Sequence, residues 1–197
     1  MPQIINLGFY SRDFTQIHHA KALRTHVKTA IENTVNMPYH WDMIEELIEV
    51  NRAQIEHRAT WMGLIYDEMV KAGVDAEAII RRAIKRCGRI HGENIKKRCA
   101  DPENLEVFRS AFLTDLVTNT FDVNPINSGK DSLSINFNYC ALVQAWKKLG
   151  FDDKTCAVLC DMAMEGDRSI AEVMGYQFEL GQTIAQGCPD CKLRFSK

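Results

Sequence analysis

The stretch of residues 176–195 constrains the fold more than any other part of the chain, because it has the pattern of a β-hairpin. Two alternating runs, residues 176–184 and 191–195, flank residues 186–190, whose glycine, proline and aspartate are typical of a turn. Side chains alternate along a strand, so Cys191 is predicted to point inward with the apolar set. The other residues expected on this inner face are Tyr176, Phe178, Leu180, Ile184, Leu193 and Phe195.

The first 112 residues have helical periodicity instead. Apolar residues at helical spacing predict helices over about residues 14–35, 44–73 and 75–98. Gly73 is a good C-terminal stop for the second of them. Residues 101–103 read Asp-Pro-Glu and predict a cap and first turn for a short helix that extends to about Phe112.

The period changes after Phe112. Residues 113–123 alternate and predict a strand, with Asp115 and Asn119 on its apolar face. Polar side chains on a covered face need partners, so these two are candidates for a polar site. A loop is predicted over residues 124–129 and a strand over 132–138, followed by helices over 139–149 and 152–164. Residues 168–175 are predicted to link the last helix to the hairpin.

These elements together predict an α+β fold. A helical portion, residues 1–112, precedes a β-β-α-α-β-β portion, residues 113–197, within a single domain of residues 1–197. Such an order implies a four-stranded antiparallel sheet with helices packed over one face.

Composition limits the possible partners. The formal net charge is −2, which gives no electrostatic reason to expect nucleic acid. No run approaches the eighteen or so apolar residues of a membrane span, and the first ten residues lack the pattern of a secretory signal. Seven cysteines without a regular framework fit a reducing compartment. We therefore expect a cytoplasmic protein with neither nucleic acid nor membrane as a partner, and a homo-oligomer stays open.

Four of the cysteines allow one metal hypothesis. Cys188 and Cys191 form a CxxC, and Cys156 and Cys160 face the same side of a helix, so the four could surround a structural zinc ion. Strand alternation does not present the first pair as a zinc knuckle would, and there is no second CxxC. We expect no cofactor and no metal, with zinc as the alternative, and interpret Cys87 and Cys99 as structural.

Two residues stand out for chemistry. Cys140 follows a predicted strand at the start of a helix, where unpaired amides and the helix dipole can lower the pKa of a thiol. Asp161 is a carboxylate among apolar helix neighbours, which requires a partner or a role. The simpler interpretations are a buried cysteine that fills space and an aspartate exposed to solvent.

The last 80 or so residues contain a recognisable order of short runs. A predicted strand ends at Cys140 and a helix ends in Leu149-Gly150, followed by the run of residues 159–163 and the runs of residues 182–187 and 191–195. In this order the chain resembles the L-2-amino-thiazoline-4-carboxylic acid hydrolase family, and the resemblance implies a small-molecule substrate. Family members tend to carry Arg-Thr-x-Thr before the turn and Cys-Asp-Phe-Arg after it. This chain has Leu-Gly-Gln-Thr over residues 180–183 and Cys-Lys-Leu-Arg over 191–194.

The resemblance implies hydrolytic opening of a cyclic amidine to a carbamoyl amino acid. Such a reaction needs a nucleophile for the C=N carbon, an acid for the departing atom and donors for the tetrahedral intermediate. We predict Cys140 or Cys191 as the nucleophile or site thiol and Asp161 as the acid or base. The predicted substrate-binding residues are Asn119, Asp115, Thr183 and Arg194.

Two other functions remain open from the sequence. A glycine followed by a cysteine-bearing last strand is similar to vinyl reductase-type ligand-binding domains, which would make the chain a non-catalytic binding or sensor domain. In the other alternative, the chain is an interaction protein whose fold is stabilised by a zinc ion bound to its cysteines. Bound zinc and turnover of small rings are the observations that separate these functions from a hydrolase.

Overall fold

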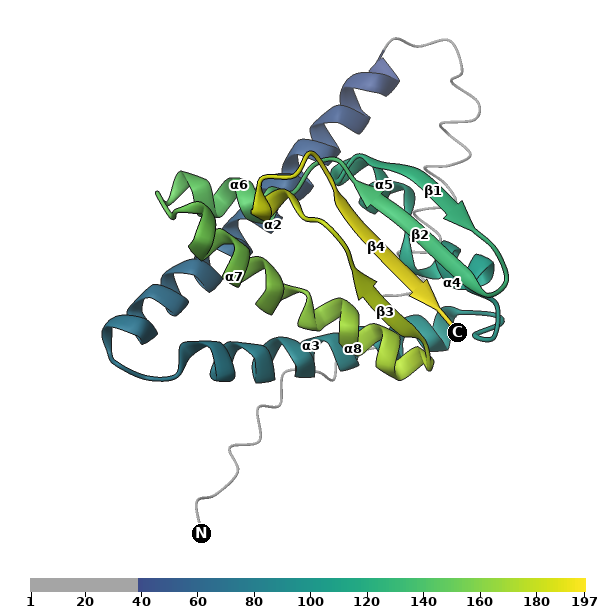
Figure 1. The fold of residues 1–197 in the computed structure, drawn as a ribbon. Helices are drawn as coiled ribbons and strands as arrows, with labels where there is room; N and C mark the ends of the chain where they lie inside the picture. The colour runs from purple at the N-terminus through teal and green to yellow at the C-terminus, as the bar shows by residue number, and fades with distance from the viewer. Residues whose placement is uncertain (1–38) are drawn as a thin grey trace, which may run out of the picture. The chain divides into compact units, whose positions relative to one another are not determined.

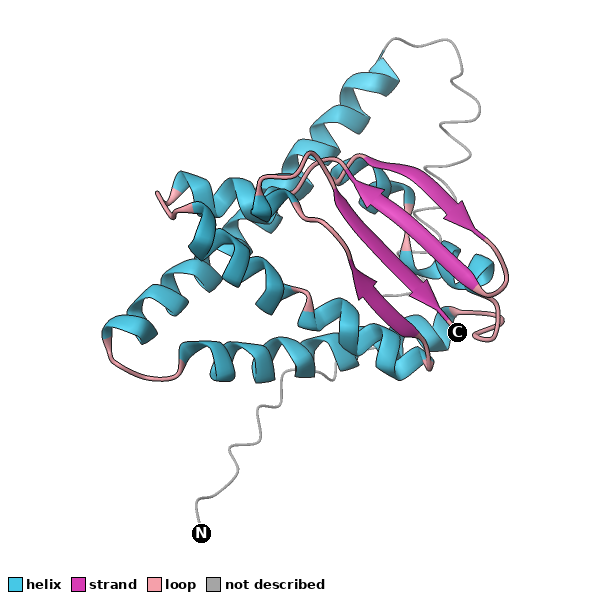
Figure 2. Ribbon diagram, viewed as in Figure 1, coloured by secondary structure: helices cyan, strands magenta, loops and turns pink. Residues whose placement is uncertain are grey.

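The computed structural model describes residues 39–197, with side chains from Met43 onward. The helix predicted over residues 14–35 therefore lies outside the described residues. Contacts divide the chain between Glu46 and Leu47, inside helix α2 (Tyr39–Lys71). Within the described part, Leu47–Lys197 holds every later helix and all of the strands (Figures 1 and 2).

Three helices predicted in the first half are confirmed. They are α2, α3 (Ala76–Arg98) and α4 (Leu105–Phe112). The Asp75 side chain caps α3 by accepting a hydrogen bond of 3.0 Å from the Ala78 amide. The cap of α4 is Asn104 and not Asp101, because the Asn104 side chain accepts from the Glu106 amide at 3.0 Å. Side-chain caps of this kind satisfy amides that have no partner within the helix.

The prediction of a strand over residues 113–123 is wrong. Residues Asp115–Thr120 form the short helix α5, whose first turn is capped by the Thr114 hydroxyl. Strand β1 (Val123–Ser128) then occupies most of the predicted loop. Pro125 is tolerated there because β1 is an edge strand of the sheet, where a missing amide donor costs no ladder hydrogen bond.

The antiparallel sheet is confirmed, with strand order β1-β2-β4-β3. Its other strands are β2 (Ser132–Phe137), β3 (Gln177–Leu180) and β4 (Cys191–Ser196). The first hairpin strand is shorter than predicted, because the chain leaves the sheet after Leu180 and forms the 3-10 helix η1 (Ile184–Gln186). In β4, Cys191, Leu193 and Phe195 are buried, as the alternation predicts.

The segment between the last predicted helix and the hairpin is also helical. After α6 (Ala141–Lys148) and α7 (Asp153–Ala163), residues Glu165–Met174 form α8 and not an irregular link. Helices α3 and α8 run side by side along the lower part of the view in Figure 1. They approach closely because Gly88 and Gly92 of α3 face α8 with no side chain between them.

Two apolar cores hold these elements together. The first lies between the inner face of the sheet and helices α3, α4 and α8, where the Phe108 ring meets those of Phe112, Tyr176 and Phe195. The second joins α2, α3, α6, α7 and η1 around Trp146, whose Nε1 donates to the Ala59 carbonyl at 2.9 Å. The fold is therefore α+β. None of the helices in residues 39–197 is long and apolar enough to span a membrane.

Candidate functional site

Three thiols come together where the two cores meet. Cys140 is the N-cap of α6, Cys160 lies near the end of α7, and Cys191 begins β4. The Phe137–Cys191 pairing places the end of β2, and with it Cys140, beside the start of β4. Cys160 lies close enough to both other thiols for their charges to act on its pKa. We call Cys140, Cys160 and Cys191 the thiol cluster.

The loop around η1 supplies polar contacts to this cluster. The Ile184 amide donates to the Cys191 Sγ at 3.2 Å. Thr183, which is only 3% exposed, lies near enough to the Cys160 thiol to lower its pKa, and its hydroxyl donates to the Gln186 Oε1 at 3.1 Å. A buried hydroxyl needs such partners, so its presence indicates a defined polar environment and not a gap in the core.

Burial disfavours the thiolate form of all three cysteines by raising the pKa of each. It raises the pKa of Cys160 to about 12 and that of Cys191 to about 11, and it also raises the pKa of Cys140. Burial is the largest influence on the pKa of Cys140 and raises it, while the backbone amides of Val143 and Leu142 at the start of α6 act in the opposite direction and are outweighed. Cys140 is the cluster member that lies at the N-terminus of a helix.

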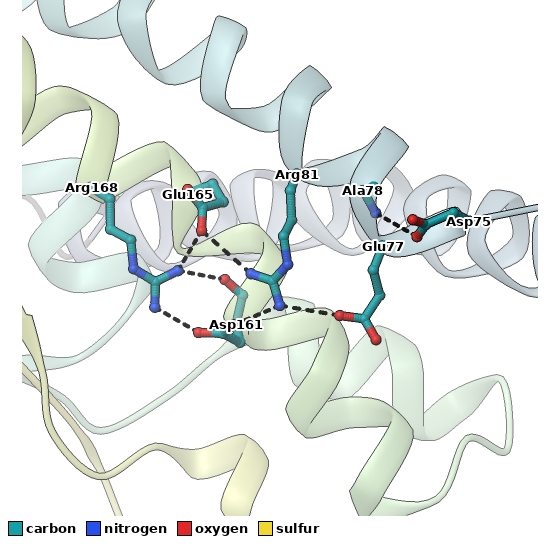
Figure 3. A network of polar contacts seen from close by, with 7 residues as sticks. All are labelled: Asp75, Glu77, Ala78, Arg81, Asp161, Glu165 and Arg168. Carbon is teal, nitrogen blue, oxygen red and sulfur yellow. Dashed lines mark hydrogen bonds and ion pairs between the residues drawn. The ribbon is translucent and has the colours of Figure 1, made fainter.

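Asp161, predicted as an acid or base, is paired with two arginines in the structure. Its Oδ1 lies 2.6 Å from the Arg168 Nη2, and its Oδ2 lies 2.7 Å from the Arg81 Nη2 (Figure 3). Partial burial opposes its ionisation, but the hydrogen bonds and charges of Arg168 and Arg81 prevail and lower its pKa. Both oxygens are therefore engaged, and the carboxylate joins α3, α7 and α8 in an ion-pair network that includes Glu77 and Glu165.

Three predicted substrate-binding residues lie away from the thiol cluster. Asp115 and Asn119 are exposed on α5, where the Asn119 Nδ2 donates to the Asp115 carbonyl at 2.8 Å. Arg194 points to the outer face of the sheet, with its Nε 4.0 Å from a Glu179 carboxylate oxygen. It lines an open groove of about 450 Å³ there, with Asn136 and Lys192. Of the predicted set, only Thr183 joins the cluster.

Two features of the site were missed by sequence reasoning. From the sequence, Cys160 is a candidate zinc ligand and part of the family-like run 159–163, with no pattern that places it beside Cys140 and Cys191. Asp190 was interpreted as a turn residue, yet its Oδ2 accepts from the Asn136 Nδ2 at 2.6 Å and its Oδ1 accepts from the Gln182 Nε2. The contact with Asn136 joins positions 54 apart, and the contact with Gln182 depends on how the loop between β3 and β4 folds, so neither follows from a pattern of neighbours.

The proposed zinc set does not assemble. Within residues 39–197, no group of three or more His, Cys, Asp or Glu side chains could hold a metal ion. Cys156 instead points its thiol at the Phe151 carbonyl, 3.8 Å away, as a protonated donor would.

Asp167 on α8 is a carboxyl whose environment penalises its charge. Burial raises its pKa from 3.8 to about 6, so the folded protein loses stability as the pH rises through this range. Asp167→Asn removes that loss. We expect the free energy of unfolding of Asp167→Asn to equal that of the wild type at pH 4 and to exceed it by about 1 to 3 kcal/mol at pH 7.5. Urea unfolding measures both values.

A matched acid gives the opposite expectation. Asp153 lies in the first turn of α7 and is 81% exposed. Its negative charge interacts favourably with the positive end of the helix dipole, so Asp153→Asn should lower the free energy of unfolding by up to about 1 kcal/mol at pH 7.5. Equal effects of the two substitutions at both pH values would contradict a burial penalty at Asp167.

Comparison with known proteins supplies the family. No curated protein matches the chain. A protein-family model, described as L-2-amino-thiazoline-4-carboxylic acid hydrolase, matches residues 52–195, which include all of β1–β4 and the thiol cluster. The match also extends well before the last 80 residues, through most of α2 and all of α3 and α4. The chain therefore belongs to the L-2-amino-thiazoline-4-carboxylic acid hydrolase family.

Proposed function

We propose that the protein is a cytoplasmic hydrolase that opens a small cyclic amidine, of the 2-amino-thiazoline-4-carboxylate type, to a carbamoyl amino acid. The observation that carries this proposal is the thiol cluster, which lies beside the Ile184 amide and the buried Thr183 hydroxyl. The chain that contains it belongs to a family named for this hydrolysis. Nucleophilic opening of a C=N bond uses these group types.

Cys140 is the proposed nucleophile. Its place at the N-terminus of α6, near the Leu142 and Val143 amides, favours the thiolate, which is the form that attacks. Addition of the sulfur to the C=N carbon places the electron pair on the ring nitrogen, which takes up a proton. Departure of a ring heteroatom opens the ring, a second proton neutralises it, and water then releases the carbon as a carbamoyl group. The net change is the addition of one water molecule.

The other two thiols are the proposed proton carriers. Cys160 and Cys191 are protonated at neutral pH, with pKa values of about 12 and about 11. A group in its acid form next to the nucleophile can donate to the departing atom and recover the proton from water. Asp161 is less suited to this task, because two arginines hold it as a carboxylate.

Position 180 bears on the choice of substrate. Leu180 packs against the first core and pairs with the buried Leu193, so its side chain is on the inner side of the sheet. Relatives tend to carry arginine in the corresponding run. A substrate carboxylate would lose that charged partner here, and we propose that this member accepts cyclic amidine or amide rings that are less acidic.

The test is a ring-opening assay with 2-amino-thiazoline-4-carboxylate, a hydantoin and a dihydropyrimidine, with detection of the carbamoyl product. Because the nucleophile has a raised pKa, its thiolate fraction rises about tenfold per pH unit below that pKa. We expect turnover of at least one ring and a kcat/KM that climbs by about this factor per unit between pH 7 and 9. Turnover of none of the rings, or a flat pH profile, would count against a thiol hydrolase.

Binding without catalysis is a second candidate. It is favoured by the protonated state of all three thiols, which makes each a weak nucleophile at neutral pH. A binding domain would show a rise in thermal midpoint with one of the rings and no product over the same pH range.

A further inference from the structure

Asp190 ties the η1 loop to the central strand β2. Its two carboxylate oxygens are shared between the loop and the sheet: the Gln182 Nε2 donates to one, and the Asn136 Nδ2 of β2 donates to the other at 2.6 Å. Both partners are partly buried, as is Asp190 itself. A carboxylate that accepts two side-chain amides in this way is held more firmly than a turn aspartate in solvent.

The residues on either side of this bridge reach the thiol cluster. Gln182 precedes Thr183 and Ile184, which contact Cys160 and Cys191, and Asp190 directly precedes Cys191. The backbone supports the same closure, because the Lys192 amide donates to the Gln182 carbonyl at 3.0 Å and the Cys188 amide to the Thr183 carbonyl at 3.2 Å. The loop thus carries an amide and a hydroxyl to the cluster and is closed at its ends by Asp190.

We infer that Asp190 is a positioning residue, which keeps the Ile184 amide on the Cys191 sulfur through its bonds to Gln182 and Asn136. Its own carboxylate is occupied by these two amides, so it acts through the loop and not on a reacting atom. The inference deepens the proposed function, on which its catalytic consequence rests. Its structural consequence, the protection of Cys191, stands without any assumption about the reaction.

The first experiment measures alkylation of each cysteine by iodoacetamide in the full chain, resolved by mass spectrometry. Cys191 is 8% exposed, so its reaction requires local opening of the loop. We expect Asp190→Ala to speed alkylation of Cys191 about tenfold or more, since it removes two hydrogen bonds to a charged group. Cys156, fully buried on α7, is the internal control and should keep its rate.

Two further variants separate hydrogen bonding from charge. Asn136→Asp combined with Asp190→Asn exchanges the two groups, and the new amide can still accept from Gln182 and donate to position 136. We expect Cys191 in this double variant to be alkylated as slowly as in the wild type, in contrast to Asp190→Ala. Asp131→Ala, which removes an exposed carboxylate on the β1–β2 turn, should behave as wild type.

Catalysis supplies the last readout. Where the wild type turns over a ring, Asp190→Ala should lower kcat about tenfold or more with a smaller change in KM, and the exchanged variant should recover most of it. Wild-type protein without ring-opening activity would remove the proposed function but leave the alkylation result intact. Asp190→Ala with unchanged Cys191 alkylation, or with equal acceleration at Cys156, would overturn the positioning role.

Discussion

Gly88→Ala should destabilise the protein, although alanine is the better helix former. A Cβ at position 88 would lie 2.5 Å from the Gly166 carbonyl oxygen and 2.8 Å from the Ser169 Cβ. Backbone cannot move aside as a flexible side chain can, so α3 and α8 must separate along their shared length. Overpacking of this kind costs about 1 to 3 kcal/mol, and more in rigid settings, even after the helix-propensity gain of about 1 kcal/mol.

Urea unfolding at neutral pH measures the effect, with a thermal midpoint as support. A loss of this size corresponds to a fall of roughly 2 to 12 °C for a chain of this length. Gly92→Ala should act in the same direction but less strongly, because its Cβ would meet the Val173 Cβ at 2.9 Å and the Ile170 Cα at 3.2 Å.

Gly166→Ala is the matched control on the opposite helix. Its Cβ would have only an ordinary contact, 3.8 Å from the Ile84 Cγ2. The substitution should therefore be neutral or stabilise by up to about 1 kcal/mol. Opposite signs at positions 88 and 166 would establish close packing as the cause, whereas equal effects would show that α3 and α8 adjust to a new side chain.

Cys140→Ser should abolish most of the proposed ring opening. Serine is close to cysteine in size and keeps the N-cap position of α6, but a hydroxyl is a far weaker nucleophile than a thiolate at any pH at which the protein is folded. We expect kcat/KM to fall roughly a thousandfold or more. Steady-state kinetics with the ring that the wild type turns over best will measure this loss.

The remaining cysteines provide graded controls. Cys191→Ser and Cys160→Ser remove the proposed proton carriers and should cost about a hundredfold each. Cys156→Ser, on the same helix as Cys160 but outside the cluster, should retain activity while losing some stability. Full activity in both Cys140→Ser and Cys191→Ser would eliminate a thiol mechanism and leave the family relationship to be explained by binding.

Local pattern was sufficient for much of the fold. The alternation of residues 132–138 and 191–195 predicted two strands and the inward direction of Cys191, because a strand with one covered face must alternate. The same pattern failed over residues 113–123, where the Thr114 cap starts a helix whose short apolar set also fits a strand. Residues 165–174 were missed because α8 is defined by its packing on Gly88 and Gly92, which lie some 80 positions earlier.

For the site, the sequence by itself determined the chemistry available: the cysteines, Thr183 and the family-like runs around them. Only the tertiary structure decided which of them act together. It joined Cys160 to Cys140 and Cys191 and engaged Asp161 with two arginines, whereas strand alternation alone already placed Arg194 on the face opposite Cys191. It also raised the pKa values of the thiols. Burial and long-range pairing set these properties, and both depend on elements far apart along the chain.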